Sequence, residues 1–195
     1  MAKIVLLIVI AAIVICLIVI GLFARKEAKK EFGTRNTETS GFFDYFFQKN
    51  PDLSFRRINI MSDKARLGGI VMEPQGTAKA LIVMTHGYGR TLEHYLPECA
   101  CFVRSGYEVL AFDGTGTGMS EGSGLKGLPQ HTIDMAHVLD HVEKDPDLCR
   151  LPLLLYGHSW GGYAANAVSC FKKYPLKGLI SVAAYNDSLA IMLPS

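Results

Sequence analysis

The sequence predicts an α/β protein with a mostly parallel sheet and helices on both of its faces, preceded by one N-terminal transmembrane helix. Apolar, β-rich runs alternate with helical patterns from about residue 54 onward. Repeated strand–helix–strand units imply right-handed crossovers and parallel strands. Near the N-terminus, the run from Ile4 to Phe23 contains no charged residue. As a helix it would span about 30 Å, the thickness of the bilayer hydrocarbon.

Length and composition limit the class of protein. A chain of 195 residues suits one domain of ordinary size, and 49% hydrophobic with 19% charged residues excludes a disordered chain. The formal charge of +2, with scattered Lys and Arg, does not indicate nucleic acid binding. The five cysteines are an odd number without framework spacing, which favours a reducing compartment. Cys99 and Cys101 form an isolated C-x-C, so we expect ordinary thiols rather than a metal site.

The apolar run at residues 4–23 favours an uncleaved membrane anchor over a cleaved signal peptide. A cleaved signal has a shorter apolar region of about 7 to 15 residues and a small-residue cleavage site. Basic residues follow the span, so the positive-inside rule places the rest of the chain in the cytoplasm as a single-pass protein. Residues 24–53 then form a juxtamembrane linker. Its aromatic stretch at residues 42–47 is expected to pack on the domain or to lie at the headgroups.

The domain at residues 54–195 begins with a hairpin, residues 55–62 and 65–74, around an Asp-Lys turn. The near-continuous apolar run at 79–87 is typical of a strand covered on both faces. Helical spacing with a Gly stop follows, and then another buried strand. The remaining expected elements, in chain order, are helix 91–106, strand 107–114, helix 132–145, strand 151–159, helix 160–175 and strand 176–185.

The segment Gly157–Gly161, GHSWG, matches the G-x-S-x-G motif between an apolar strand and an amphipathic helix. The turn from strand to helix is so sharp that the glycines are needed to avoid side-chain collisions, and Ser159 is held in strained geometry. The helix start adds free N–H groups near developing negative charge. We therefore expect Ser159 to be a nucleophile. The alternative is an ordinary N-cap serine.

Three motifs together resemble those of the α/β-hydrolase superfamily. HGYG at 86–89 resembles its oxyanion loop. DGTGTGMSEG at 113–122 is similar to its D-x-R-G-x-G-x-S turn, with Thr115 where Arg is common. GHSWGG at 157–162 resembles its nucleophile elbow. The likeness is greatest to the serine-hydrolase branch, which includes monoacylglycerol-lipase-like and serine-aminopeptidase-like proteins, and it extends over about residues 66–185.

This resemblance implies a site without a cofactor. The backbone amides of Tyr88 and Trp160 would form the oxyanion hole, while His86 and Gly87 support its loop. No metal or organic cofactor is implied. The GTGTG run lacks the G-x-G-x-x-G spacing of dinucleotide sites.

The base and the acid are the missing parts of the motif set. In this superfamily the order is Ser, Asp or Glu, then His. All histidines of the chain precede Ser159: His86, His94, His131, His137, His141 and His158. Asp187 is the candidate acid, with loop or helix capping as its alternative role. The resemblance thus predicts a chain truncated after the sixth strand, without its cap insertion and its C-terminal strands.

We do not expect an earlier histidine to replace the base. The side chain of His158 should point away from the Ser159 hydroxyl. His137 and His141 are expected on a solvated helix face with Asp134, because the pattern lacks the Glu of H-E-x-x-H. The opposite, apolar stripe would consist of Ile133, Ala136, Leu139 and Val142.

The sequence thus predicts a membrane-anchored serine hydrolase that attacks a small acyl ester or amide. The anchor favours a lipid derivative as the substrate. The alternative is a non-catalytic, membrane-tethered binding or scaffold protein with a partial hydrolase fold. Ending at strand 176–185 would leave an apolar sheet edge, so we also expect association through that edge.

Overall fold

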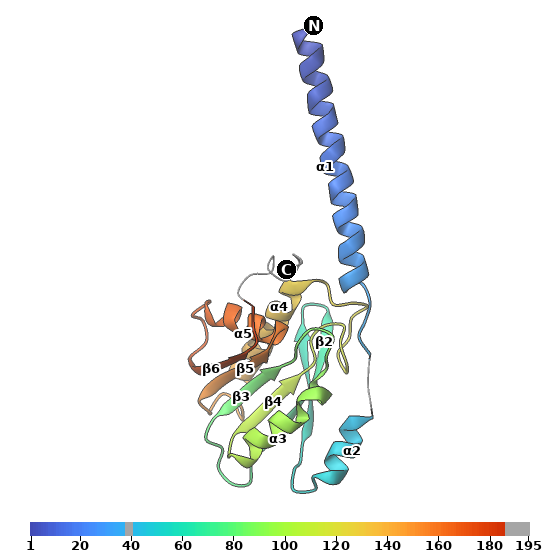
Figure 1. Ribbon diagram of the computed structural model, residues 1–195. Coiled ribbons are helices and arrows are strands. Elements are labelled where there is room, and N and C mark those ends of the chain that lie inside the picture. Colours follow the sequence, from blue (N-terminus) through green and yellow to red (C-terminus); the bar gives the residue numbers. More distant parts are fainter. Residues whose placement is uncertain (38–40, 186–195) are drawn as a thin grey trace.

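The computed structural model describes residues 1–37 and 41–185, which form one long helix and an α/β domain (Figure 1). The predicted α/β class is confirmed. The elements are α1 (Ala2–Phe32), α2 (Phe42–Lys49), β1 (Arg56–Ser62), β2 (Ala65–Met72), β3 (Leu81–Thr85), the 3₁₀ turn η1 (Leu92–Tyr95), α3 (Leu96–Arg104), β4 (Glu108–Phe112), α4 (Leu128–Lys144), β5 (Leu153–His158), α5 (Trp160–Ser169) and β6 (Leu176–Val182).

The six strands form one mixed sheet in the order β1-β2-β4-β3-β5-β6. The hairpin β1–β2 and the pair β2–β4 are antiparallel, and the pairs among β4, β3, β5 and β6 are parallel. The parallel strands therefore end at one edge of the sheet. The loops after β3, β4 and β5 meet there, which is where α/β proteins build their sites.

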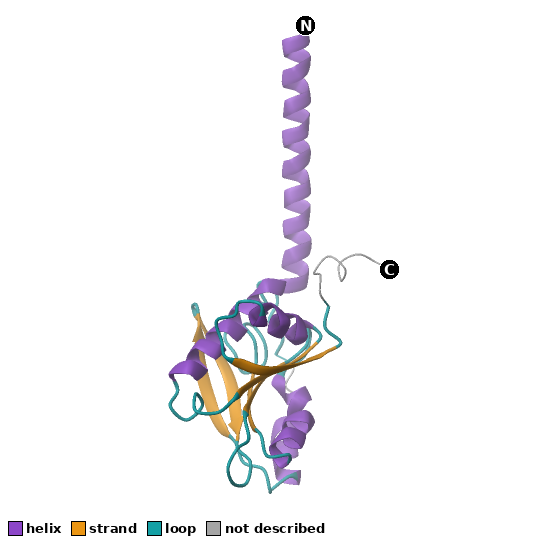
Figure 2. Cartoon of the chain, turned by 90° about the vertical axis from the view of Figure 1, so that its left-hand side faces the viewer, coloured by secondary structure: helices purple, strands orange, loops and turns teal. Residues whose placement is uncertain are grey.

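Helices cover both faces because the central strands alternate between two cores. Leu81 and Val83 of β3 pack into a core with α4 and α5, while Ile82 and Met84 pack into a second core with α2 and α3. Period-two alternation explains how one fully apolar strand supplies both layers. The edge-on view in Figure 2 shows helices on either side of the sheet.

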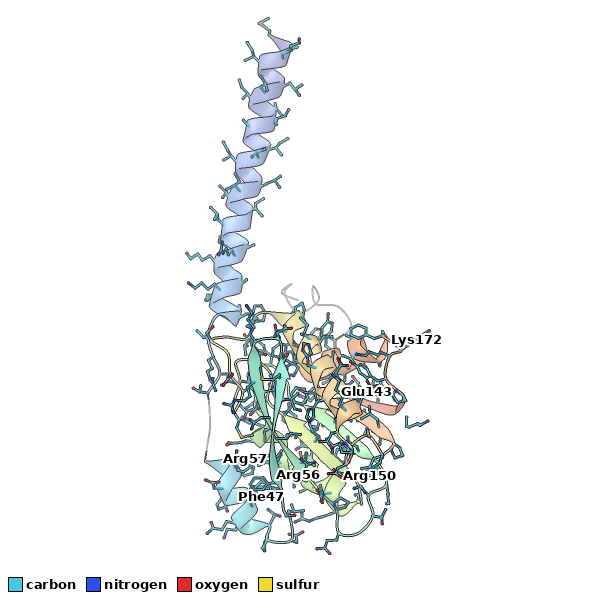
Figure 3. The ribbon with its side chains drawn as sticks, turned by 180° about the vertical axis from the view of Figure 1, so that it is seen from behind. Phe47, Arg56, Arg57, Glu143, Arg150 and Lys172 are labelled. Atoms are coloured by element: carbon cyan, nitrogen blue, oxygen red, sulfur yellow. The ribbon has the colours of Figure 1, made fainter. Side chains whose placement is uncertain are left out.

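The segment that we treated as a linker contains two helical parts. Helix α1 continues beyond the apolar run to Phe32, and the aromatic stretch forms α2. Phe43 and Phe46 are buried in the second core. Arg57 of β1, labelled in Figure 3, lies over the Phe43 ring, 5.1 Å from its centroid. The aromatic stretch thus packs on the domain.

The buried face of helix α4 differs in part from the predicted one. It begins at Leu128, four residues earlier than expected, after Gly127 with φ of 97°. Ile133, placed in the apolar stripe, is 39% exposed, whereas Asp134, placed on the solvated face, is completely buried. Leu139 and Val142 of the predicted stripe are buried, so the prediction was wrong only for Ile133 and Asp134. Asp134 is buried because it binds to other buried groups, which a hydrophobic pattern does not reveal.

Asp134 joins three segments of the domain beneath the sheet edge. Its carboxylate accepts hydrogen bonds from the Ser62 hydroxyl at 2.7 Å and from the Gln130 side chain at 2.9 Å. It also accepts from the Thr115 amide at 2.7 Å and the Thr115 hydroxyl at 2.8 Å. The hairpin, α4 and the loop after β4 are therefore held together by one buried acid.

Strand β6 lies at one edge of the sheet in the described part of the chain and ends at Val182, three residues before the predicted end. Ile180 and Val182 are 40% and 39% exposed. Association through this edge stays a prediction.

We expect Asp134→Ala to destabilise the domain by about 3 kcal/mol, because it leaves several buried donors without an acceptor. Urea unfolding of the full chain in detergent, followed by tryptophan fluorescence, measures this. Asp147→Ala, which removes an exposed carboxylate after α4, is the matched control. Equal midpoints for the two variants would contradict the structural role of Asp134.

Candidate active site

Ser159 lies at the turn between β5 and α5 in an unusual backbone conformation, with φ of 51° and ψ of −113°. A positive φ in a non-glycine residue is strained and persists only where the surrounding structure imposes it. The Ser159 amide donates to the Val182 carbonyl at 2.8 Å, and its carbonyl accepts from the Tyr163 amide at 2.9 Å. Its side chain makes no capping hydrogen bond. The geometry is therefore that of an elbow rather than of an ordinary N-cap.

Two glycines make this turn possible. A Cβ on Gly157 would lie 2.3 Å from the Gly161 carbonyl oxygen. A Cβ on Gly161 would lie 2.6 Å from the Thr85 carbonyl oxygen and 2.7 Å from that of His86. These distances are too short for any side chain, so both positions require glycine, as the motif predicts.

Hydrogen bonds from two other segments hold the loop after β3 in place. Buried His86 donates through Nδ1 to the Gly87 carbonyl at 2.9 Å and accepts through Nε2 from the Gly114 amide at 3.1 Å. The Gly87 amide donates to the Tyr95 hydroxyl at 3.1 Å. That hydroxyl also shares a 2.9 Å hydrogen bond with Nδ1 of His158. His158 therefore stabilises the loop through Tyr95, in agreement with the expectation that its side chain points away from the Ser159 hydroxyl.

Trp160 follows Ser159 as the first residue of α5, so its amide has no partner within the helix. Its indole is buried and donates to the Leu128 carbonyl at 2.8 Å. The ring stacks on His131 at 4.3 Å between centroids and meets Tyr88 edge-on at 5.8 Å. These contacts fix the backbone at the helix start next to Ser159.

Ser159, Tyr88 and Trp160 line one cavity of about 810 Å³. The structure thus brings together the predicted nucleophile and both predicted oxyanion residues, with His86 and Gly87 behind them. Asp187 lies outside the described residues. The sequence interpretation missed the contribution of helix α1, which supplies half of the described lining residues: Ala24, Glu27, Ala28, Glu31 and Phe32.

A buried polar cluster supports the site and was also missed. Asp113 accepts from the Leu92 amide at 2.7 Å and from the Met119 amide at 2.9 Å. Burial raises the pKa of Asp113 and lowers the pKa of His86 beside it. Burial also lowers the pKa of His131 well below its usual value, so this ring is neutral at pH 7. The available sequence signal was the spacing of His131, Asp134 and Val138, which places the two polar residues on the same helix face as an apolar one.

No histidine in the described residues hydrogen-bonds to the Ser159 hydroxyl. Besides the bonds of His86 and His158, the His131 ring bonds to Thr85 at 2.6 Å, and that of His137 to Ser62 at 3.0 Å. His94 caps η1 through Thr91, and His141 lies near Asp145. The part of the chain that the structure describes also holds no group of three or more potential metal-ligating residues.

Solved structures define the class of this fold. An esterase from Pyrococcus furiosus matches with a TM-score of 0.66 and 17% identity, over 79% of this chain and 56% of that chain. A serine hydrolase homologue from Coxiella burnetii matches with a TM-score of 0.55 and 20% identity, over 60% of this chain and 58% of that chain. At these identities the likeness shows the fold alone, which is that of the α/β-hydrolases.

The family model described as serine aminopeptidase, S33, matches residues 76–190, and the chain belongs to this family. Human monoglyceride lipase is 31% identical over 112 residues, which are 57% of this chain and 37% of the human protein. Mouse monoglyceride lipase is 32% identical over 114 residues, again 37% of that protein. The matched region thus spans little more than a third of these relatives.

We expect Ser159→Gly to stabilise the domain by about 1 kcal/mol, since glycine adopts positive φ without strain. Ser169→Gly is the matched control, because it lies in the right-handed conformation at the end of the same helix. It should destabilise by about 0.5–1 kcal/mol. Urea midpoints of both variants measure the difference, and a loss of stability in both would argue against strain at Ser159.

Proposed function

We propose that this chain is a membrane-anchored serine hydrolase in which Ser159 attacks the carbonyl carbon of an acyl ester or amide. The observation that carries the proposal is the positive φ of Ser159 at the rim of a cavity that it shares with Tyr88 and Trp160. Strain of this kind collects at functional sites. Family membership supports hydrolysis, and the name of the monoglyceride lipases supports a glycerol ester as the first substrate to test.

The proposed oxyanion hole consists of the Tyr88 and Trp160 amides. One belongs to the loop after β3, in which the neighbouring Gly87 amide donates to the Tyr95 hydroxyl, and the other belongs to the first turn of α5. Donors in this arrangement stabilise the charge that develops on the carbonyl oxygen, and loss of one typically costs about 3 kcal/mol.

Proton transfer needs a base within hydrogen-bond reach of the Ser159 hydroxyl. The described residues contain all histidines of the chain, and each is engaged elsewhere or lies apart from Ser159. Asp187 stays the candidate acid. This observation favours a second candidate function, a non-catalytic protein that binds an acyl ligand in the same cavity without hydrolysing it.

Labelling with a fluorophosphonate probe separates the two functions. If Ser159 is activated, the full chain labels, Ser159→Ala does not, and Ser169→Ala labels like the wild type. Gel fluorescence measures the labelling rate, and circular dichroism confirms that each variant is folded. Absence of labelling in folded wild type would leave only the binding function.

The proposed location is a single-pass membrane protein with a cytoplasmic domain. Helix α1 is long and apolar enough to cross a bilayer, and its apolar run is not buried by the domain; a signal sequence would meet the same criterion. Lys29 and Lys30 in its last turn support this orientation.

A membrane-impermeant maleimide tests this orientation. The exposed thiols of Cys101, Cys149 and Cys170 should react only after the cells are opened, whereas a cysteine introduced by Ala2→Cys should react in intact cells. The protein should also stay in the membrane fraction after carbonate washing. Labelling of the native thiols in intact cells would reverse the proposed orientation, and release by carbonate would refute the anchor.

A further inference from the structure

The last turns of α1 present two different faces. Ala24, Glu27, Ala28, Glu31 and Phe32 all line the cavity that contains Ser159. Their spacing of three and four residues places them on one side of the helix. The basic residues occupy the positions between them: Arg25, Lys26, Lys29 and Lys30. The helix therefore turns its small, aromatic and acidic side chains toward the cavity and its basic side chains outward.

This end of α1 is fixed to the domain. The Tyr88 hydroxyl donates to the Glu31 carbonyl at 2.9 Å, and the Leu125 amide donates to the Phe32 carbonyl at 2.8 Å. The Phe32 ring meets the Tyr88 ring edge-on, 6.0 Å between centroids. Figures 1 and 2 show that α1 extends away from the domain and reaches it only at this end. The helix wall thus has a defined position relative to Tyr88 and Ser159.

The cavity begins where the apolar run ends. The last residue of that run is Phe23, and the next residue, Ala24, is the first that lines the cavity. From Ala24 to Phe32 the helix rises about 12 Å. The headgroup layer on one side of a bilayer is about 5–8 Å thick. With α1 in a membrane, the cavity lies across the headgroups and starts at the edge of the hydrocarbon.

The lining fits the acyl chain of an amphiphile and disfavours an anionic headgroup. Ala24 and Ala28 leave space beside the helix, and Phe32, Leu128 and Trp160 add apolar surface. The charged side chains among the described lining residues are Glu27 and Glu31, both carboxylates. A phosphate or carboxylate on the ligand would be repelled by both at close range.

We propose that the inner face of α1 from Ala24 to Phe32 is a wall of the substrate pocket. An uncharged single-chain amphiphile enters this pocket from the bilayer surface, whereas anionic amphiphiles are excluded from it. This inference rests on the proposed function for the identity of the pocket. It adds the entry route and the selection by headgroup charge.

The test uses photocrosslinking of the full chain in phosphatidylcholine vesicles, so that no catalysis is needed. One probe is a long-chain monoalkylglycerol ether with a diazirine in its chain, and the second has a phosphate in place of the glycerol. Mass spectrometry measures the crosslink yield at peptides that contain Leu128 or Trp160. Anionic probe held at the outer, basic face of α1 does not contribute to this yield.

In the wild type, the glycerol probe should crosslink these peptides about tenfold more than the phosphate probe. Glu27→Gln combined with Glu31→Gln should remove most of that preference, whereas Glu143→Gln on the surface of α4, labelled in Figure 3, should keep it. Ala28→Trp should lower the glycerol-probe yield about tenfold by filling the cavity. Gly21→Trp, two turns earlier, has free space around it and should not.

Equal yields of the two probes in the wild type, or crosslinks confined to the lipid-facing run of α1, would overturn the inference. Fluorophosphonate labelling of the same samples tests the proposed function separately. Labelling of Ser159 without cavity crosslinks refutes the α1 wall alone. Cavity crosslinks without labelling refute the hydrolase and leave the binding pocket.

Discussion

The close approach between the first turn of α5 and the end of β3 determines the arrangement of the candidate site. The Cα of Gly161 faces the carbonyl oxygens of Thr85 and His86 so closely that no Cβ fits. This contact brings the helix start against the loop that carries Tyr88, and it requires the chain to turn within one residue of β5. Ser159 takes the resulting strain as a positive φ. The position of helix α5, the conformation of Ser159 and the placement of the Tyr88 and Trp160 amides therefore depend on one backbone contact.

The sequence predicted these features because each depends on local information. Continuous apolar runs identified β3, β4 and β5, and the glycines at 157 and 161 identified the turn between strand and helix. Element ends were less accurate. Helix α5 ends at Ser169, six residues before the predicted end, and the residues after it include Lys172 with φ of 52°. Turns of this kind have weak sequence signals.

Contacts between distant segments were not predictable in the same way. Asp134 and His131 look like surface residues on a helical pattern, yet both are buried, because Thr115 in the loop after β4 and Thr85 at the end of β3 bind them. A polar residue is buried when a partner satisfies it, and the partner is known only from the fold. The position of α1 beside Ser159 depends likewise on the contacts of Phe32 and Tyr88, more than 50 residues apart in the chain.

The loop after β4 connects the end of α1 to the candidate site. Its Leu125 amide binds the last carbonyl of α1, and the amide of Asn36 and the carbonyl of Gly116 bond at 2.8 Å. In the same loop, the Gly114 amide donates to His86, the residue that directly follows β3. These bonds connect α1, the loop and His86 in series, and they hold the end of α1 in a defined position on the domain. With α1 in a membrane, as proposed, the cavity would keep one orientation toward the bilayer, and this arrangement would favour uptake of a ligand from the membrane surface over uptake from solution.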